Sequence, residues 1–85
     1  MGFNLRCIED LSDSFVDDYY ITIGANVKRI REAKGLTQLE LSHALGFTSV
    51  GLVSQAELYL KKQHFNIKHL LHIAYILECD VKDFF

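Results

Sequence analysis

The sequence has no proline and no tryptophan, and it contains only two cysteines and no long apolar run. Two cysteines are too few for the disulfide framework of a small secreted domain, and Cys7 and Cys79 stand in no metal-ligand spacing. No stretch approaches the roughly 18 consecutive apolar residues that a transmembrane helix needs. We therefore expect a cytoplasmic protein with no membrane partner and no metal or other cofactor.

The net charge is also small: the 85 residues sum to a formal charge of −2. The charge is divided unevenly: residues 1–18 carry five carboxylates against Arg6 alone, whereas residues 19–85 carry eight Lys and Arg against six carboxylates. With 49% apolar and 24% charged residues, the composition is that of a globular domain. We expect an acidic N-terminal arm, residues 1–18, followed by one mildly basic domain, residues 19–85.

Apolar residues recur at helical spacing through the second segment, which predicts an all-α fold of five helices. The first helix is indicated by three residues spaced i, i+4, i+7: Ile23, Val27 and Ile30. Gly35 should end this helix in a left-handed cap. Thr37 and Glu40 form a capping-box pattern that starts the second helix, and Gly46 should end it.

Three further helices are expected after Gly46. Ser49 should cap the third and Asn66 the fourth, while Asp80 should cap a short last turn. The residues expected to face inward are Val53, Ala56 and Leu60 on the third helix, and Ile67, Leu70, Leu71, Ala74 and Leu77 on the fourth. Helices joined by such short connections form a bundle.

The arm begins with a different period. Phe3, Leu5 and Cys7 alternate with polar residues, which predicts a short strand over residues 3–8. A lone strand is not stable in water, so this one should pair with another copy or lie over Leu39, an apolar residue expected at the surface. Residues 9–18 are then an acidic linker.

One stretch resembles a known family. Gly35-Leu36-Thr37-Gln38, followed by Leu41, Leu45-Gly46, Val53-Ser54 and Ala56-Glu57, is similar to the Cro/repressor-type helix-turn-helix proteins, the XRE family. Downstream, Ile67, Leu70-Leu71, Ile73-Ala74 and Leu77 are similar to the family's fourth helix, so the resemblance spans residues 22–85. It implies a five-helix, lambda-repressor-like domain that binds double-stranded DNA, regulates transcription and has no enzymatic activity.

The resemblance also implies which residues meet DNA. The second helix of such a motif lies in the major groove with its N-terminal residues at the base edges, so the base contacts are Ser49, Val50, Gly51 and Gln55. Gln55 has the clearest chemistry, because an amide can pair bidentately with adenine. The candidate phosphate contacts are Gln38, Lys28, Arg29, Lys61 and Lys62. Arg31 and Glu57 match a structural ion pair of the family.

The chain departs from the family pattern between the third and fourth helices. Tyr59 stands in place of the usual glycine and Phe65 in place of the usual proline, and the connection is about two residues longer. The turn before the third helix is also one residue longer. These differences suggest that the third helix runs on through Leu60.

A single small domain offers few base contacts, so we expect a homodimer that reads a pseudo-palindromic operator. The family includes repressors, but the sequence leaves open whether this chain represses or activates, and no small-molecule effector is evident in it. Two apolar surfaces are interface candidates: Tyr75, Ile76 and Phe85 near the C-terminus, and Phe3 and Leu5 in the arm.

Two alternatives stay open. The chain could be an antitoxin-like or adaptor module that uses the same scaffold to bind a protein. A metal-responsive regulator would need a third ligand, from His64 or Cys79, beside His69 and His72.

Overall fold

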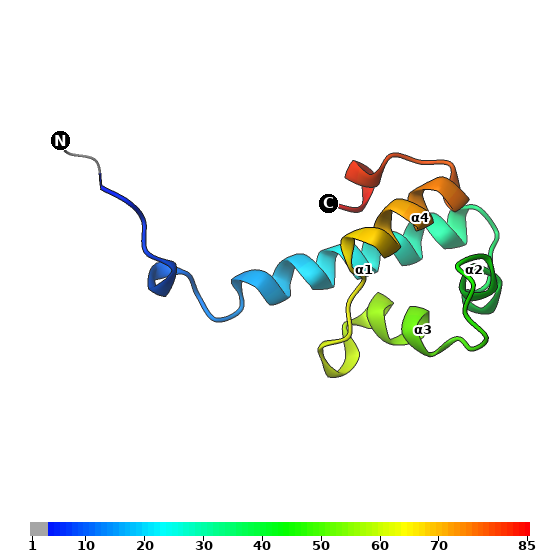
Figure 1. Cartoon of the computed structure of the whole chain (residues 1–85), viewed down its shortest axis with the longest axis horizontal. Coiled ribbons are helices and arrows are strands. Elements are labelled where there is room, and N and C mark those ends of the chain that lie inside the picture. Colours follow the sequence, from blue (N-terminus) through cyan, green and yellow to red (C-terminus); the bar gives the residue numbers. More distant parts are fainter. Residues whose placement is uncertain (1–3) are drawn as a thin grey trace.

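The computed structural model describes residues 4–85, and all regular secondary structure in that range is helical. Four α-helices follow one another, α1 (Phe15–Ala33), α2 (Gln38–Ala44), α3 (Gly51–Leu58) and α4 (Ile67–Leu77), as Figure 1 shows. Three short 3₁₀ helices are η1 (Ile8–Asp10), η2 (Leu60–Lys62) and η3 (Val81–Phe84). The all-α class is confirmed, but the expected fifth helix is only the 3₁₀ turn η3.

Local signals at the ends of α1 and α2 behave as the sequence predicts. Gly35 and Gly46 take left-handed φ angles of 77° and 90°, at which a side chain would be strained. The Leu36 N–H donates to the carbonyl of Arg31 at 3.2 Å, which closes α1 in a Schellman motif. Thr37 then starts α2 with a complete capping box. Two helix ends and one helix start are thus fixed by neighbouring residues alone.

The limits of α3 differ from the prediction at both ends. Ser49 does not cap the helix: the capping position is occupied by Val50, whose side chain makes no capping hydrogen bond. At the other end Tyr59 takes a left-handed conformation with φ 53°, which stops the helix at Leu58. Leu60 therefore lies in η2, largely exposed, and not on the inner face of α3.

The core lies where α1 crosses α3 and α4 (Figure 1). Its buried apolar residues are Ile23, Val27, Leu41, Val53, Ala56, Phe65, Leu70, Ile73, Ala74, Leu77 and Phe84. Two residues predicted to face inward do not: Ile67 and Leu71 on α4 are 64% and 53% exposed, because the core covers only the opposite side of that helix.

Gly24 is the point of closest approach between α1 and α3. A β-carbon at this position would lie 2.8 Å from the carbonyl oxygen of Glu57 and closer still to that of Ala56. The two helix backbones therefore touch without an intervening side chain, which no periodicity in the sequence indicates.

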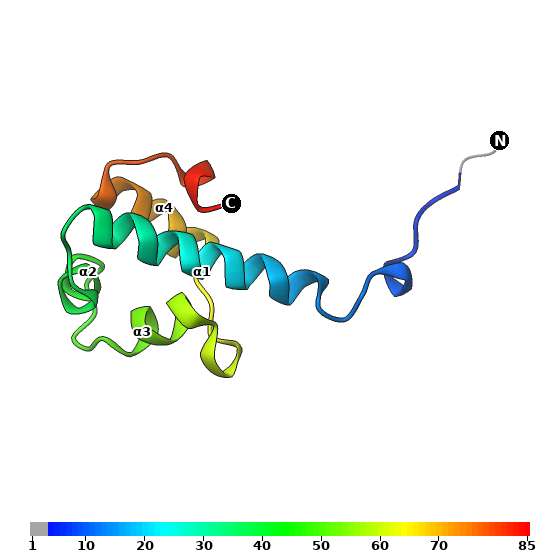
Figure 2. The ribbon, with the colours of Figure 1, turned by 180° about the vertical axis from the view of Figure 1, so that it is seen from behind.

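The described part of the arm, residues 4–14, leaves the body along the direction of α1, as Figure 1 and Figure 2 show from opposite sides. The strand predicted for residues 3–8 is not formed within the described residues: residues 4–7 are irregular and Ile8 begins η1, since no second strand is present to pair with. Phe3 lies outside the described residues. Leu39 is 47% exposed and belongs to α2, which lies at the end of the body away from the arm (Figure 1), so the arm of the same chain does not cover it.

α1 also starts inside the segment expected to be a linker. Its first residue is Phe15, and Asp17 and Asp18 lie in its first turn, where carboxylates interact favourably with the helix dipole. Among the helices of residues 4–85, none combines the length and the apolar character needed to cross a membrane.

Candidate nucleic-acid interface

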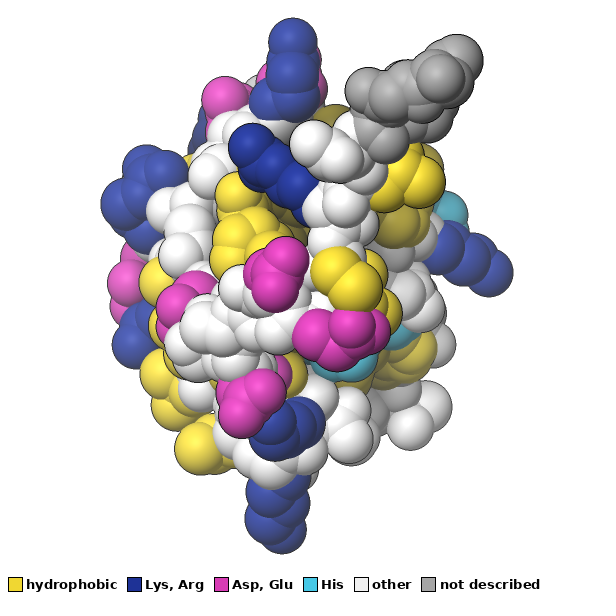
Figure 3. Space-filling view, turned by 90° about the vertical axis from the view of Figure 1, so that its left-hand side faces the viewer, with side chains coloured by type: hydrophobic (Ala, Val, Ile, Leu, Met, Phe, Trp, Pro, Cys, Tyr) yellow, Lys and Arg dark blue, Asp and Glu magenta, His cyan; other side chains and the backbone are white. Residues whose placement is uncertain are grey.

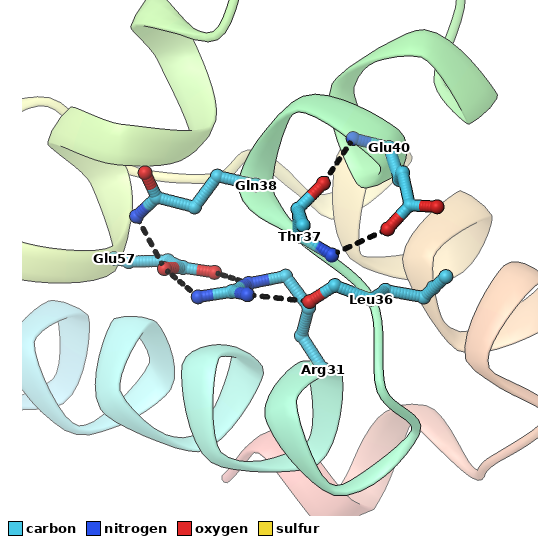
Figure 4. Close-up of polar contacts among 6 residues, drawn as sticks. All are labelled: Arg31, Leu36, Thr37, Gln38, Glu40 and Glu57. Atoms are coloured by element: carbon cyan, nitrogen blue, oxygen red, sulfur yellow. Dashed lines mark hydrogen bonds and ion pairs between the residues drawn. The ribbon is translucent and has the colours of Figure 1, made fainter.

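A buried polar network joins α1, α2 and α3 (Figure 4). The Arg31 guanidinium donates from Nε to Glu57 Oε2 at 2.7 Å and from Nη2 to Glu57 Oε1 at 3.0 Å. Its Nη1 donates to the carbonyl oxygen of Leu36 at 2.7 Å. Arg31 is only 5% exposed and Glu57 only 2%, so the expected ion pair is present and almost fully buried.

The network contains one member that the sequence does not reveal. Gln38 donates from Nε2 to Glu57 Oε1 at 3.0 Å, so Glu57 accepts hydrogen bonds from α1 and from the start of α2 (Figure 4). Hydrogen bonding to Glu57 raises the pKa of Arg31 above its already high value. The consequence is mechanical: α3 is held near its C-terminal end by charge-assisted hydrogen bonds from two other helices.

The opposite end of α3 is accessible. Ser49 is exposed, and Val50, Gly51 and Gln55 are half-buried, whereas Val53 and Ala56 face the core. Leu52 also packs partly against the core, which leaves the four predicted base-contact residues on the outer side of α3 and its preceding turn.

Gly51 is not required by packing. A β-carbon there would meet only the Ser49 hydroxyl oxygen, at 3.8 Å, which is an ordinary contact distance. Glycine at the first helical position costs helix stability relative to alanine. The fold therefore gains nothing from the missing side chain, in contrast to Gly24.

The candidate phosphate contacts fall into two groups. Lys28, half-buried, and Arg29, exposed, lie on α1, while Lys61 and Lys62 lie exposed in η2. Lys62 is partly engaged, because its Nζ lies 3.2 Å from Asp17 Oδ2. Both lysines have left-handed φ angles, 52° and 60°, in a connection that contains no glycine.

The connection between α3 and α4 is tied to the N-terminal half of α1. The Tyr59 hydroxyl donates to Asp17 Oδ1 at 2.6 Å, which lowers the pKa of Asp17 and raises the pKa of Tyr59 to about 12. The Tyr20 ring stacks on the rings of His64 and Tyr59, with centroid distances of 3.9 and 5.6 Å. These contacts, between residues more than 35 positions apart, were not predictable from local sequence.

His69, one of the two histidines at the centre of the alternative metal site, has a structural role. His69 Nδ1 accepts the N–H of Asn66 at 3.1 Å, which completes the capping box of α4. Burial lowers the pKa of His69, which favours the neutral ring that this bond requires. Within residues 4–85, no three His, Cys, Asp or Glu side chains come together as a possible metal site.

The predicted dimer residues are separated in space. Leu5 is 84% exposed in the arm, Tyr75 is 87% exposed on α4, and Phe85 is exposed at the C-terminus. Ile76 is partly buried against the core and so offers less surface than expected.

Comparisons of the chain with protein-family models, with curated proteins and with solved structures find no match. Two structural features therefore bear on function: the accessible start of α3 and the polar network that holds its other end.

Proposed function

We propose that this chain is a sequence-specific double-stranded DNA-binding transcription regulator of the XRE type, a homodimer that reads a pseudo-palindromic operator as a repressor. In this proposal α2 and α3 form the helix-turn-helix, and α3 enters the major groove with its N-terminal residues at the base edges. The observation that carries it is the asymmetry of α3: Glu57 is hydrogen-bonded to Arg31 and Gln38, while Ser49 is exposed and Gly51 is only half-buried.

Base reading in this proposal depends on few side chains. Gln55 supplies an amide for bidentate pairing with adenine, and Val50 supplies an apolar contact for a thymine methyl group. Ser49 adds a hydroxyl that accepts or donates, and the absence of a side chain at Gly51 lets the DNA approach the helix backbone. A site that uses one amide and one methyl contact favours A·T base pairs.

Phosphate contacts position the protein without reading sequence. Gln38, at the first position of α2, uses one amide N–H for Glu57 and has its second N–H for a phosphate oxygen. Lys28, Arg29, Lys61 and Lys62 supply charge around the motif. The carboxylates of the arm repel phosphates, so the arm lies away from the DNA.

Gln55→Ala should reduce the discrimination at one base pair of each half-site by about 1–3 kcal/mol, the worth of a good bidentate contact. Binding titrations on a series of single-base operator variants, obtained by selecting genomic fragments on the protein, measure this. Gln38→Ala is the comparison variant and should weaken binding to every operator variant alike. An unchanged base preference in Gln55→Ala would remove this residue from the reading surface.

Gly51→Ala should weaken DNA binding without lowering the stability of the fold. Because a β-carbon fits at this position and alanine favours the helix, we expect the free energy of unfolding to stay the same or rise by up to about 1 kcal/mol. DNA binding should nevertheless weaken, because the added methyl group stands where the DNA approaches. Urea unfolding and DNA titration on the same preparation provide the two measurements, and a variant that binds as tightly as the parent would contradict the close approach.

A second candidate function is an antitoxin-like or adaptor module that binds a protein through the same scaffold. The observation in its favour is the exposed apolar surface beside α1 and α4, where Val16, Tyr19, Ile67 and Phe85 are all more than half exposed. DNA binding that weakens steeply with salt supports the regulator. If the chain does not bind duplex DNA at low salt, the result supports the protein-binding module.

A further inference from the structure

An apolar groove lies beside the N-terminal half of α1, with a volume of about 470 Å³. Ile23 and Leu70 form its floor, and Val16, Tyr19, Ile67 and Phe85 form exposed walls. These residues come from three separate parts of the chain: α1, the start of α4 and the C-terminus. Exposed apolar side chains that surround a groove are a candidate surface for a protein partner.

The arm carries the matching apolar residues. Leu5 and Ile8 are 84% and 80% exposed, and Leu11 is also exposed, at regular spacings of three residues. The backbone hydrogen bonds of η1 run only within the arm, from Asp10 to Cys7 and from Leu11 to Ile8. The arm extends beyond the end of α1 in both Figure 1 and Figure 2. Its apolar side chains are thus without cover in the single chain.

Charge on the two surfaces is partly complementary, since the α1 wall of the groove also carries Asp17 and Asp18. The arm places Glu9, Asp10 and Asp13 beside its apolar residues. The segment that lines the groove, residues 64–67, is flanked by three exposed lysines, Lys61, Lys62 and Lys68, of which Lys62 already pairs with Asp17 on α1. In the end-on view of Figure 3, acidic side chains gather toward the middle, Lys and Arg lie mostly around the edge, and hydrophobic side chains are visible between them.

We propose that the groove is occupied by the N-terminal arm of a second copy of this chain, and that the two copies exchange arms reciprocally. Leu5, Ile8 and Leu11 enter the apolar groove of the partner, and the arm carboxylates lie near Lys68, the flanking lysine on α4 that is not among the proposed phosphate contacts. This rests on the homodimer of the proposed function, and it names the surface that forms it. Each copy has one arm and one groove. A two-fold symmetric dimer therefore covers both arms and both grooves.

The geometry favours a second copy over the chain's own arm. The chain enters α1 directly beside the groove residue Val16, through a turn in which the Phe15 N–H donates to the Ser12 carbonyl oxygen and the Asp18 N–H to the Ser14 carbonyl oxygen. Folding the arm back would reverse the chain at this turn and break these bonds. The groove also lies on the N-terminal half of α1, whereas α2 lies at the far end of that helix (Figure 1), so a partner there leaves the start of α3 free.

Ile8→Glu on the arm and Ile67→Glu at the groove test the exchange, with sedimentation equilibrium without DNA as the measurement. Both residues are exposed in the single chain, so neither variant should unfold it. The parent should be a dimer at micromolar concentration, and each variant should raise the dissociation constant about a hundredfold, because a carboxylate would be buried against apolar surface. Tyr75→Glu, 87% exposed and outside the groove, is the matched control and should leave the dimer unchanged.

Mixing the two variants gives a sharper test. An Ile8→Glu copy keeps its groove and an Ile67→Glu copy keeps its arm, so the mixture restores one of the two contacts and should dimerise more tightly than either variant alone. No recovery in the mixture would overturn arm exchange. A parent that stays monomeric, or a dimer that Tyr75→Glu dissociates while Ile67→Glu does not, would also overturn it.

Removal of residues 1–14 provides an independent check that keeps α1 whole, since this helix begins at Phe15. The truncated chain should be folded and monomeric, and a truncated chain that remains a dimer contradicts the proposal. Failure here is distinguishable from failure of the DNA-binding proposal. A dimer that is weakened by Ile8→Glu and Ile67→Glu but does not bind duplex DNA refutes only the DNA-binding proposal. A DNA-binding dimer that is insensitive to both variants refutes only the exchange.

Discussion

Gly24→Ala should destabilise the protein by about 3 kcal/mol, near the upper end of the range for overpacking. The added β-carbon would lie 2.8 Å from the Glu57 carbonyl oxygen and closer still to that of Ala56. Both are backbone atoms of α3, so no side-chain rotation relieves the clash and the two helices have to separate. Helix propensity alone predicts the opposite result, a gain of about 1 kcal/mol for alanine over glycine inside a helix. The sign of the change therefore decides between the two effects.

Urea unfolding followed by circular dichroism measures the change. Ala25→Gly is the matched control, since Ala25 is the exposed next residue of α1 and reports propensity without contact with α3. It should cost about 1 kcal/mol, the usual difference between the two residues. If Gly24→Ala proves as stable as the parent, α1 and α3 do not approach at this point. Gly51→Ala, on an open part of α3, completes the contrast between a glycine that packing requires and one that it does not.

Glu57→Gln and Arg31→Met should each destabilise the protein by about 3–5 kcal/mol, because each leaves one buried charge without its partner. The pair is bidentate, with donor–acceptor distances of 2.7 and 3.0 Å, and both residues are almost fully buried. Glu57→Gln also leaves Arg31 and Gln38 facing an amide that accepts at only one atom. The double variant Arg31→Met/Glu57→Met should recover much of the loss, since replacing both partners by apolar groups removes the stranded charge.

A double-mutant cycle from urea unfolding measures the coupling between Arg31 and Glu57. Lys62→Met is the control, because Lys62 pairs with Asp17 at 3.2 Å at the surface, where ion pairs contribute little. Additive losses in the cycle would show that the two residues do not act as a pair. The same variants report on function: in the proposed regulator a loosened C-terminal end of α3 should weaken binding to all operators.

Local signals predicted the helix ends well. The capping boxes at Thr37 and Asn66 and the left-handed glycines Gly35 and Gly46 depend on hydrogen bonds between residues three to five positions apart. Such bonds form almost independently of the rest of the chain. Where the local signal was weak the prediction was wrong: Ser49 does not cap α3, and Tyr59 ends that helix without a glycine.

The candidate site was predicted in part. The Arg31–Glu57 pair followed from the resemblance to a family, whereas the bond from Gln38 to Glu57 had no separate signal, because a glutamine at the start of a helix is ordinary. The close approach at Gly24 was missed for a similar reason. A single glycine inside a helical pattern does not show which neighbour it faces.

The sequence by itself determined the all-helical class, the order of the four α-helices, the end of α1, both ends of α2 and the start of α4, since these depend on periodicity and on caps within a few residues. Only the tertiary structure decided which apolar residues are covered. Ile67 and Leu71 belong to the same apolar run as Leu70 and Leu77, yet they face outward because the core contacts one side of α4. The extent of α1 and the groove beside it depend on contacts such as Tyr59 with Asp17 and Tyr20 with His64. Those pairs lie 42 and 44 positions apart, and their contacts form only once the chain has folded.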